Sequence, residues 1–264
     1  MSKIKTTDIV KYLKDLFPIE EIPEWDRVGF QIEEVYGLAS QDTVDKILVC
    51  LDLTKEALNK AIEIKANLII TKHPFIFNEK EQELNNPAKK AMYELLIEKE
   101  IQVYSIHTNY DSSNNNNLMD LIFSQFNIEK YKKVGEVNEG YKITLLSEMV
   151  LEDVVAKMKF IFGKPNCLLS RNANLDKLIK RFYITPGAGA SCMIFEQLSG
   201  EVFITGEAKW NEWLYADQND NTMLGLGHYM ENHFIDDIAS KINKTYGDSI
   251  VVVPYDIKNT FKYI

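Results

Sequence analysis

The chain has 264 residues, 45% of them hydrophobic and 26% charged, and can bury a core as one large domain or two compact lobes. Its formal net charge of -9 argues against nucleic-acid binding, because nucleic-acid binders usually carry a basic face. No apolar run approaches the roughly 18 residues of a membrane span, and lysines interrupt the N-terminal segment where a signal peptide would be continuously apolar. We therefore expect a cytoplasmic protein that binds neither membranes nor nucleic acid.

The cysteines argue against two kinds of structural cross-link. Cys50, Cys167 and Cys192 are an odd number, lie far apart and show no CxxC spacing. Neither a disulfide framework nor a zinc site made of thiolates is indicated. Buried, reduced thiols are the expected state, because free cysteine is among the most often buried residue types.

The first half of the chain alternates helical and strand patterns. N-cap residue types before an amphipathic run predict an initial helix. Continuous apolar runs separated by helical ones predict the buried strands of a parallel sheet. The expected elements are a helix over 7–17, an ordered loop over 23–31, a strand over 46–51, a helix around 57–66, a strand over 67–71, a helix over 87–100 and a strand over 101–106.

The second half repeats this alternation with similar spacing. In each half, a nearly equal distance separates the first apolar strand from a later strand that ends in Ile-Thr. The expected elements are a loop over 111–117, a helix over 118–126, strands over 141–146, 181–185, 201–205 and 222–227, and helices over 151–162, 190–198 and 207–215.

These patterns predict an α/β fold of two similar lobes built from βαβ units with mainly parallel sheets. We expect the lobes to comprise residues 1–132 and 133–264, with the break near 128–138 and the second lobe a pseudo-repeat of the first.

Three of the four histidines follow predicted strands, where ligands of open α/β sheets gather. These are His73, His107 and His228; Asp111 comes four residues after His107, and Glu231 three residues after His228. Imidazole and carboxylate ligands together suit Zn, Fe, Mn or Ni, and the lack of thiolates favours an exchangeable or catalytic site. For any single histidine, the alternative is a hydrogen-bonded structural role.

Five segments together resemble the NIF-three-like family, whose members are labelled type 2 GTP cyclohydrolase I homologues. The resemblance runs in order from about Ile9 to Pro254. The segments are WDRVGFQ at 25–31, LIITKHP at 68–74, SIHTNYD at 105–111, FITGE at 203–207 and GHY at 227–229.

The resemblance implies a two-lobed protomer that assembles as a homohexameric ring, with a two-metal site between the lobes. His73, Asp111 and His228 would be metal ligands, and His107 would line the same cavity as a ligand or as a proton-transfer group. The implied function is a metal-dependent hydrolase acting on a purine nucleotide or another polar substrate. The alternative from a different class is a non-catalytic metal-binding or interaction protein.

Two positions depart from the family pattern. Lys72 stands where the family has the first of two adjacent histidines, so one of the two metals loses a ligand. The lysine could replace the charge of that metal, bind an anionic ligand or lie solvated at the rim. The family glutamate after His228 falls on Asn232, or on Glu231 if the turn is one residue shorter; the apolar helical face that follows favours Glu231. We therefore expect one or two divalent ions per chain.

Two weaker features have ordinary structural explanations. The PGAGAS segment at 186–191 could cradle an anion at a helix start, but it lacks a third glycine and a Walker lysine, which favours a tight turn. Trp210, Trp213 and Tyr215 could stack on a heterocycle, although packing in a helix core is the more common use. Glu207 lies nearby and could stabilise Lys72 or hold a water.

Overall fold

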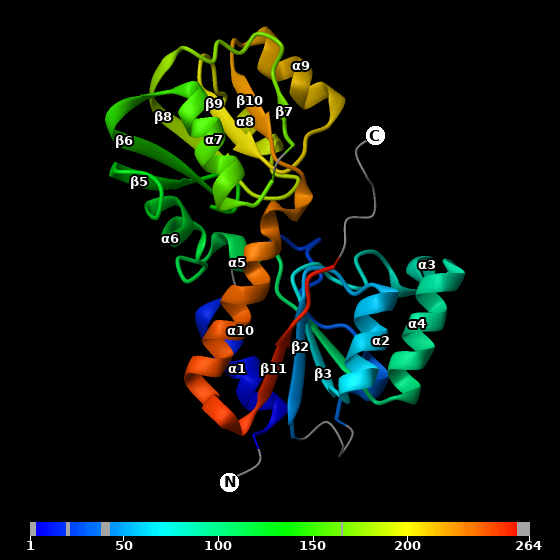
Figure 1. Ribbon diagram of the computed structural model, residues 1–264. Helices are drawn as coiled ribbons and strands as arrows, with labels where there is room; N and C mark the ends of the chain where they lie inside the picture. The colour runs from blue at the N-terminus through cyan, green and yellow to red at the C-terminus, as the bar shows by residue number, and fades with distance from the viewer. Residues whose placement is uncertain (1–3, 20–21, 38–42, 165, 258–264) are drawn as a thin grey trace. The chain divides into compact units, whose positions relative to one another are not determined.

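The computed structural model describes residues 4–19, 22–37, 43–164 and 166–257 (Figure 1). The described residues form two compact units: unit 1 contains those up to Asn115 and those from Phe234 on, and unit 2 contains Asn116–His233. Each unit has its own sheet with helices packed on it, so the predicted α/β class is confirmed. Among the described residues, no helix combines the length and the apolar character that a membrane span requires.

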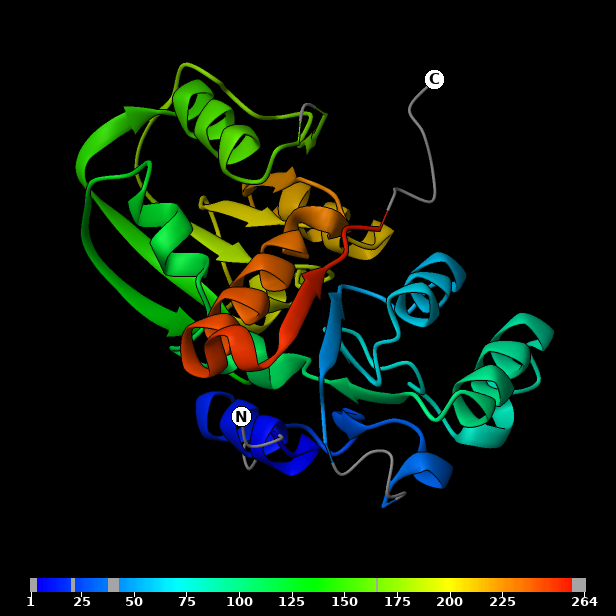
Figure 2. The ribbon, with the colours of Figure 1, turned by 60° about the horizontal axis from the view of Figure 1, so that its bottom comes forward.

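Unit 1 is built on a five-stranded sheet of order β1-β4-β3-β2-β11, in which only the β1 pairing is antiparallel. Figures 1 and 2 show α1 and α10 on one side of this sheet and α2 and α4 on the other. The strands are β1 (Gly29–Phe30), β2 (Lys46–Cys50), β3 (Leu68–Thr71), β4 (Gln102–Ser105) and β11 (Val251–Pro254). The helices are α1 (Thr6–Leu16), α2 (Lys55–Ile64), α3 (Lys80–Glu83), α4 (Pro87–Glu98), α5 (Thr108–Ser112) and α10 (His233–Tyr246), with short 3-10 helices η1 (Glu33–Val35) and η4 (Gly247–Ser249).

Local sequence signals set the helix ends of unit 1. The Thr54 side chain accepts a hydrogen bond from the backbone amide of Ala57 and begins α2, and Lys65 ends it in the left-handed conformation at φ 58°. Asn86 caps α4, whose first residue is a proline that needs no amide partner there. The strands β3, which follows α2, and β4, which follows α4, are buried along their whole length, as expected for a sheet covered on both faces.

Unit 2 has a six-stranded sheet of order β5-β6-β8-β9-β10-β7, in which β8, β9 and β10 are parallel neighbours. Helices α6 and α7 pack with the core residues of one face, and α8 and α9 with those of the other. The strands are β5 (Ile128–Val134), β6 (Gly140–Val150), β7 (Leu168–Leu169), β8 (Leu178–Thr185), β9 (Val202–Thr205) and β10 (Thr222–Gly225). The helices are α6 (Leu118–Phe123), α7 (Leu151–Ile161), α8 (Ser191–Phe195) and α9 (Trp210–Gln218), followed by the 3-10 helix η3 (His228–Asn232).

The division of the chain differs from the predicted lobes at 1–132 and 133–264. The predicted break near 128–138 contains β5, which pairs with β6 inside unit 2. After unit 2 the chain returns to unit 1, because α10 packs there and β11 adds a parallel strand beside β2. The short run 251–254 pairs only with residues about 200 positions earlier, and no local pattern reveals such a pairing.

The cysteines and the surface agree with the composition. The three thiols are free, Cys50 and Cys192 are buried, and burial raises the pKa of Cys192 to about 12.

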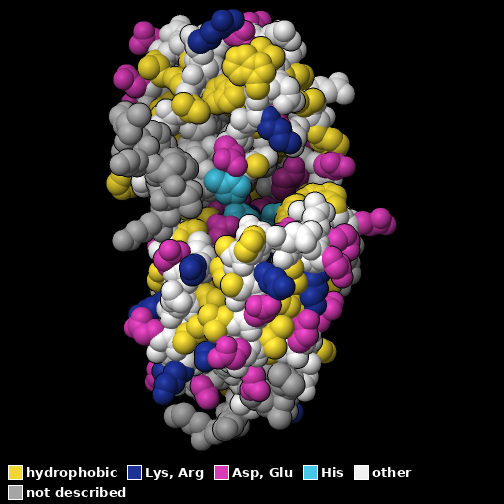
Figure 3. Space-filling view, turned by 90° about the vertical axis from the view of Figure 1, so that its right-hand side faces the viewer, with side chains coloured by type: hydrophobic (Ala, Val, Ile, Leu, Met, Phe, Trp, Pro, Cys, Tyr) yellow, Lys and Arg dark blue, Asp and Glu magenta, His cyan; other side chains and the backbone are white. Residues whose placement is uncertain are grey.

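On the face that Figure 3 shows, Lys and Arg side chains are interspersed with Asp and Glu over both units, without the broad basic face of a nucleic-acid binder.

Candidate metal-binding residues

Unit 1 places two histidines at the carboxyl ends of neighbouring parallel strands. His73 follows β3 and His107 follows β4, and their ring centroids lie 5.7 Å apart. Nδ1 of His73 lies 2.8 Å from Oδ1 of Asp52, and Nδ1 of His107 lies 2.8 Å from Oδ1 of Asp26. A carboxylate that accepts from Nδ1 fixes the tautomer in which Nε2 carries the lone pair, as in most protein metal-ligand histidines.

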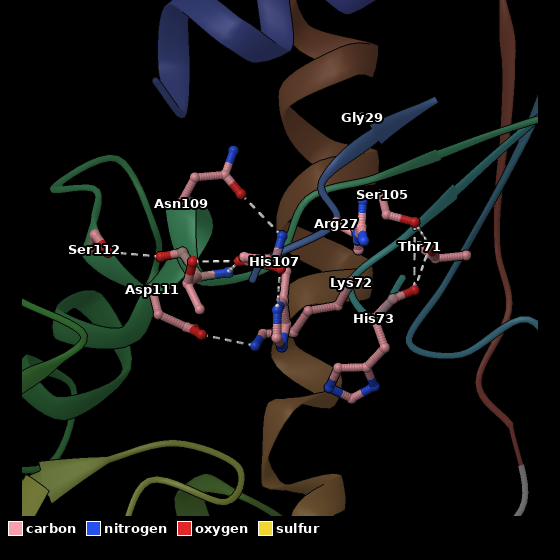
Figure 4. A network of polar contacts seen from close by, with 12 residues as sticks. Arg27, Gly29, Thr71, Lys72, His73, Ser105, His107, Asn109, Asp111 and Ser112 are labelled. Atoms are coloured by element: carbon pink, nitrogen blue, oxygen red, sulfur yellow. Dashed lines mark hydrogen bonds and ion pairs between the residues drawn. The ribbon is translucent and has the colours of Figure 1, made fainter. Parts of the chain in front are cut away.

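Backbone contacts at the strand end hold His73 in place (Figure 4). Its amide donates to the carbonyl of Leu51, 3.0 Å away, just after β2. The Thr71 hydroxyl donates to the His73 carbonyl at 2.8 Å and lies 2.7 Å from the Ser105 hydroxyl on β4. The chain therefore leaves the sheet at His73 in a turn that both neighbouring strands support.

Asp26 is a buried carboxylate that orders both His107 and the start of α5. It accepts hydrogen bonds from the backbone amide and the hydroxyl of Thr108, the first residue of α5. Burial by itself would raise the pKa of Asp26, but the hydrogen bonds of His107 and Thr108 and the charge of His107 outweigh it and lower that pKa. The predicted ordered loop over 23–31 thus supplies a fixed anion beneath His107.

The lowered pKa of Asp26 makes this carboxylate a source of stability that depends on pH. The contribution is fully present above the unfolded-state pKa of about 4 and is lost as the pH falls through the lower folded-state pKa. We expect Asp26→Asn to reduce the free energy of unfolding by about 1–3 kcal/mol at pH 7. The difference from the parent protein should shrink toward pH 3. Urea denaturation at both pH values measures this, and an equal difference at both would contradict it.

Lys72 forms a buried ion pair with a residue that the sequence predicts to be a metal ligand. The side chain of Lys72 is 1% exposed, and its Nζ donates to Oδ2 of Asp111 at 2.8 Å (Figure 4). A buried ammonium requires such a counter-charge. The alternative of a solvated lysine at the rim is therefore wrong, and part of the Asp111 charge is already neutralised inside unit 1.

Unit 2 places His228 between two carboxylates. His228 comes soon after β10; its Nδ1 lies 2.8 Å from Oε1 of Glu207, and its Nε2 lies 3.0 Å from Oε2 of Glu231. Glu231 is only 2% exposed. A neutral imidazole has one N–H, so the ring donates to both carboxylates only when it is protonated; a metal ion held by Nε2 and Glu231 would take the place of that second proton. Glu231 is thus the residue after His228 whose carboxylate faces its ring.

The PGAGAS segment makes room for Glu231. The carbonyl of Gly187 accepts a hydrogen bond from the amide of Glu207 at 2.9 Å and one from the hydroxyl of Thr205 at 3.2 Å. Gly187 has a φ of +59°, and a Cβ at this position would lie 2.6 Å from Oε1 of Glu231. The glycine therefore serves a tight turn and the close approach of a buried carboxylate.

Comparison with known proteins connects this arrangement to one family. A family model described as Duf34/NIF3 (NGG1p interacting factor 3) matches residues 4–260. The chain belongs to the Duf34/NIF3 family. A GTP cyclohydrolase 1 type 2 homolog of Mycoplasmopsis pulmonis is 30% identical to this Duf34/NIF3 chain over 250 residues, covering 94% of the chain and 96% of that relative.

Other Duf34/NIF3 relatives agree in sequence or in fold. NIF3-like protein 1 of Drosophila melanogaster is 26% identical over 94% of this chain and 85% of that relative. The crystal structure of a Bacillus cereus protein related to NIF3 has a TM-score of 0.82 at 16% identity and covers 100% of both chains, which supports the shared fold. The resemblance first seen in five short segments is confirmed.

Proposed function

We propose that this Duf34/NIF3 protein is a cytoplasmic, metal-dependent hydrolase-like protein. Its metal ion would be bound by His73, Asp111, His228 and Glu231. The observation that carries the proposal is the geometry shared by His73, His107 and His228, each of which has Nδ1 against a carboxylate. Imidazole and carboxylate donors without thiolates fit Zn, Fe, Mn or Ni with an open coordination position. Such an ion, when bound, lowers the pKa of a coordinated water and so supplies a nucleophile near neutral pH.

Other side chains of unit 1 would transfer protons or orient the metal ligands. Asp26 holds Nδ1 of His107, which leaves Nε2 of that ring to accept and return a proton. Asp52 orients His73 as a ligand in the same way. Asp111 has one carboxylate oxygen on Lys72, so its charge is shared between the ammonium and an ion.

Two exposed aromatic rings beside His107 favour the hypothesis that the substrate is planar. Trp25 is 56% exposed and Phe77 is 42% exposed, and their ring centroids lie 6.2 and 6.1 Å from that of His107. Such rings stack on flat heterocycles, and large apolar side chains at a soluble surface often mark binding sites. Together with the name of the Mycoplasmopsis pulmonis relative, this supports a purine nucleotide such as GTP as the substrate.

Turnover of GTP is the experiment that tests the proposal. Metal-loaded protein should consume GTP, and consumption should stop with a chelator and in His73→Ala, as measured by chromatography of the nucleotides. His107→Ala provides the sharper comparison, because it should retain the metal while losing most of the turnover, by about 100-fold or more. A metal-loaded protein that leaves GTP and other nucleotides unchanged would contradict catalysis.

A second candidate function is a non-catalytic metal-binding protein. The observation that favours it is the Lys72–Asp111 pair, which occupies part of the ligand set with a side-chain cation. Retention of metal without nucleotide turnover would select this function.

We extend the proposal to assembly as a closed homo-oligomer, with a hexamer as the expected size. The support is family membership over residues 4–260. Light scattering at micromolar concentration should return about six times the chain mass of 30.5 kDa. A mass near that of one chain would contradict it.

A further inference from the structure

Unit 2 carries a cationic groove on its sheet, at the end formed by β5, β6 and β8. Tyr141, Ile143 and Leu145 of β6 point into the core that α7 covers, so Lys142 and Thr144 project from the opposite face. The groove has a volume of about 440 Å³. Its charged lining residues are Lys130, Lys142, Lys177, Lys180, Arg181, Glu148 and Glu201.

The groove carries a net positive charge, although the protein as a whole has a net negative charge. Five cations face two carboxylates there, whereas the whole chain has a formal net charge of -9. One of the carboxylates, Glu201, holds Arg181 through contacts of 2.8 and 2.9 Å to its Nε. The Lys180 ammonium donates to the carbonyl of Leu146 at 2.7 Å and lies 3.5 Å from Oε2 of Glu129, a third carboxylate beside the groove. These contacts fix two of the cations in place before any ligand arrives.

The pairing of β5 with β6 places lysines opposite each other, which destabilises the sheet. Lys132 of β5 and Lys142 of β6 are direct partners in the antiparallel ladder, so both project from the same face. Like charges placed opposite each other destabilise a sheet. Lysines on an edge strand such as β5 can serve to prevent aggregation, and the Lys142 ammonium lies 5.2 Å from the centroid of the Tyr183 ring. Neither feature explains Lys177 ahead of β8. An anion bound over this face would relieve the repulsion.

We propose that this groove is a binding site for a compact ligand that carries two or more phosphate groups. Its volume lies within the roughly 300–1,000 Å³ of small-molecule sites. Lysine and arginine are the residues that usually donate hydrogen bonds to phosphate groups, and Arg181 has further N–H groups besides those that donate to Glu201. A nucleic acid requires a broad basic face, whereas this groove is local and Figure 3 shows basic and acidic side chains interspersed on the face that it presents. The groove therefore favours a small polyanion. The site is separate from the histidines of the proposed metal centre. Its residues at 177–181 and 200–202 lie at the amino ends of β8 and β9, whereas His228 follows the carboxyl end of the parallel strand β10.

Calorimetric titration with tripolyphosphate at low salt tests the proposal on the full chain. We expect saturable binding that weakens as salt is raised. The double variant Lys130→Glu/Lys142→Glu should bind at least about tenfold more weakly, because each lost charge-assisted hydrogen bond reduces affinity by roughly that factor. Lys130→Gln/Lys142→Gln, which removes charge without reversing it, should lose less.

Three controls decide the location and the ligand class. Lys157→Glu/Lys159→Glu, with the same charge change on α7, should bind tripolyphosphate like the parent. His73→Ala should also bind like the parent, because it alters only the proposed metal centre. Equal affinity in the groove and α7 variants, loss of binding in His73→Ala alone, or binding of a single-stranded oligonucleotide without tripolyphosphate would each overturn the proposal. Circular dichroism melts should show that the groove variants remain folded.

Discussion

Lys72→His is expected to raise the metal content of the dialysed protein by about one ion per chain. In the parent, the buried Lys72 ammonium lies 2.8 Å from Asp111 and neutralises part of the charge that a second ion would need. Two unit positive charges at roughly 4 Å repel by about 4 kcal/mol at an effective dielectric constant of 20, so an ammonium and a divalent ion repel by about twice that amount. The histidine variant removes this repulsion, adds an imidazole beside His73 and releases Asp111.

Lys72→Ala is the matched control for that increase. It removes the same charge but supplies no ligand, so its metal content should lie between those of the parent and Lys72→His. It also leaves Asp111 without its buried partner, which is expected to destabilise the fold by about 3–5 kcal/mol. If all three proteins hold the same amount of metal, Lys72 does not compete with a cation.

Glu231→Gln is expected to weaken metal binding by more than about 100-fold. The carboxylate of Glu231 faces Nε2 of His228 at 3.0 Å, and an amide of the same shape carries no negative charge for a cation. Glu207→Gln should weaken metal binding less, by about 10–100-fold, because Glu207 orients the His228 ring through Nδ1 and would not contact the ion.

Asn232→Ala distinguishes the two positions that the sequence leaves open for the family glutamate. It should keep the affinity of the parent within about threefold, since the carboxylate beside His228 comes from Glu231. Competition with a fluorescent chelator measures all three variants on one scale. Equal losses in Asn232→Ala and Glu231→Gln would contradict the assignment of Glu231.

Much of the fold could be predicted because its signals are local. The apolar runs at 46–51 and 67–71 and the caps at Thr54 and Asn86 lie within a few residues of the elements that they define, and β2, β3, α2 and α4 form close to the expected bounds. Pairings over long separations could not be predicted. The charged strand β5 resembles a linker until β6 folds beside it, and β11 depends on β2.

In the candidate site, too, local features could be predicted from the sequence and long-range contacts could not. The histidines could be singled out because each follows a buried strand, a feature visible in the sequence. Their partners Asp26 and Asp52 could not be predicted, because Asp26 precedes His107 by 81 residues and Asp52 resembles an ordinary helix cap. The burial of Lys72 was equally hidden, because its counter-charge, Asp111, lies on a different element.

Elemental analysis of the purified, dialysed protein tests the central claim most directly. If His73, Asp111, His228 and Glu231 hold a metal while the Lys72 ammonium takes the place of a second one, the parent should contain about one Zn, Fe, Mn or Ni ion per chain. The metal should disappear in His228→Ala. A value near two per chain would show that Lys72 excludes nothing, and a value near zero after growth in metal-supplemented medium would contradict the metal centre itself.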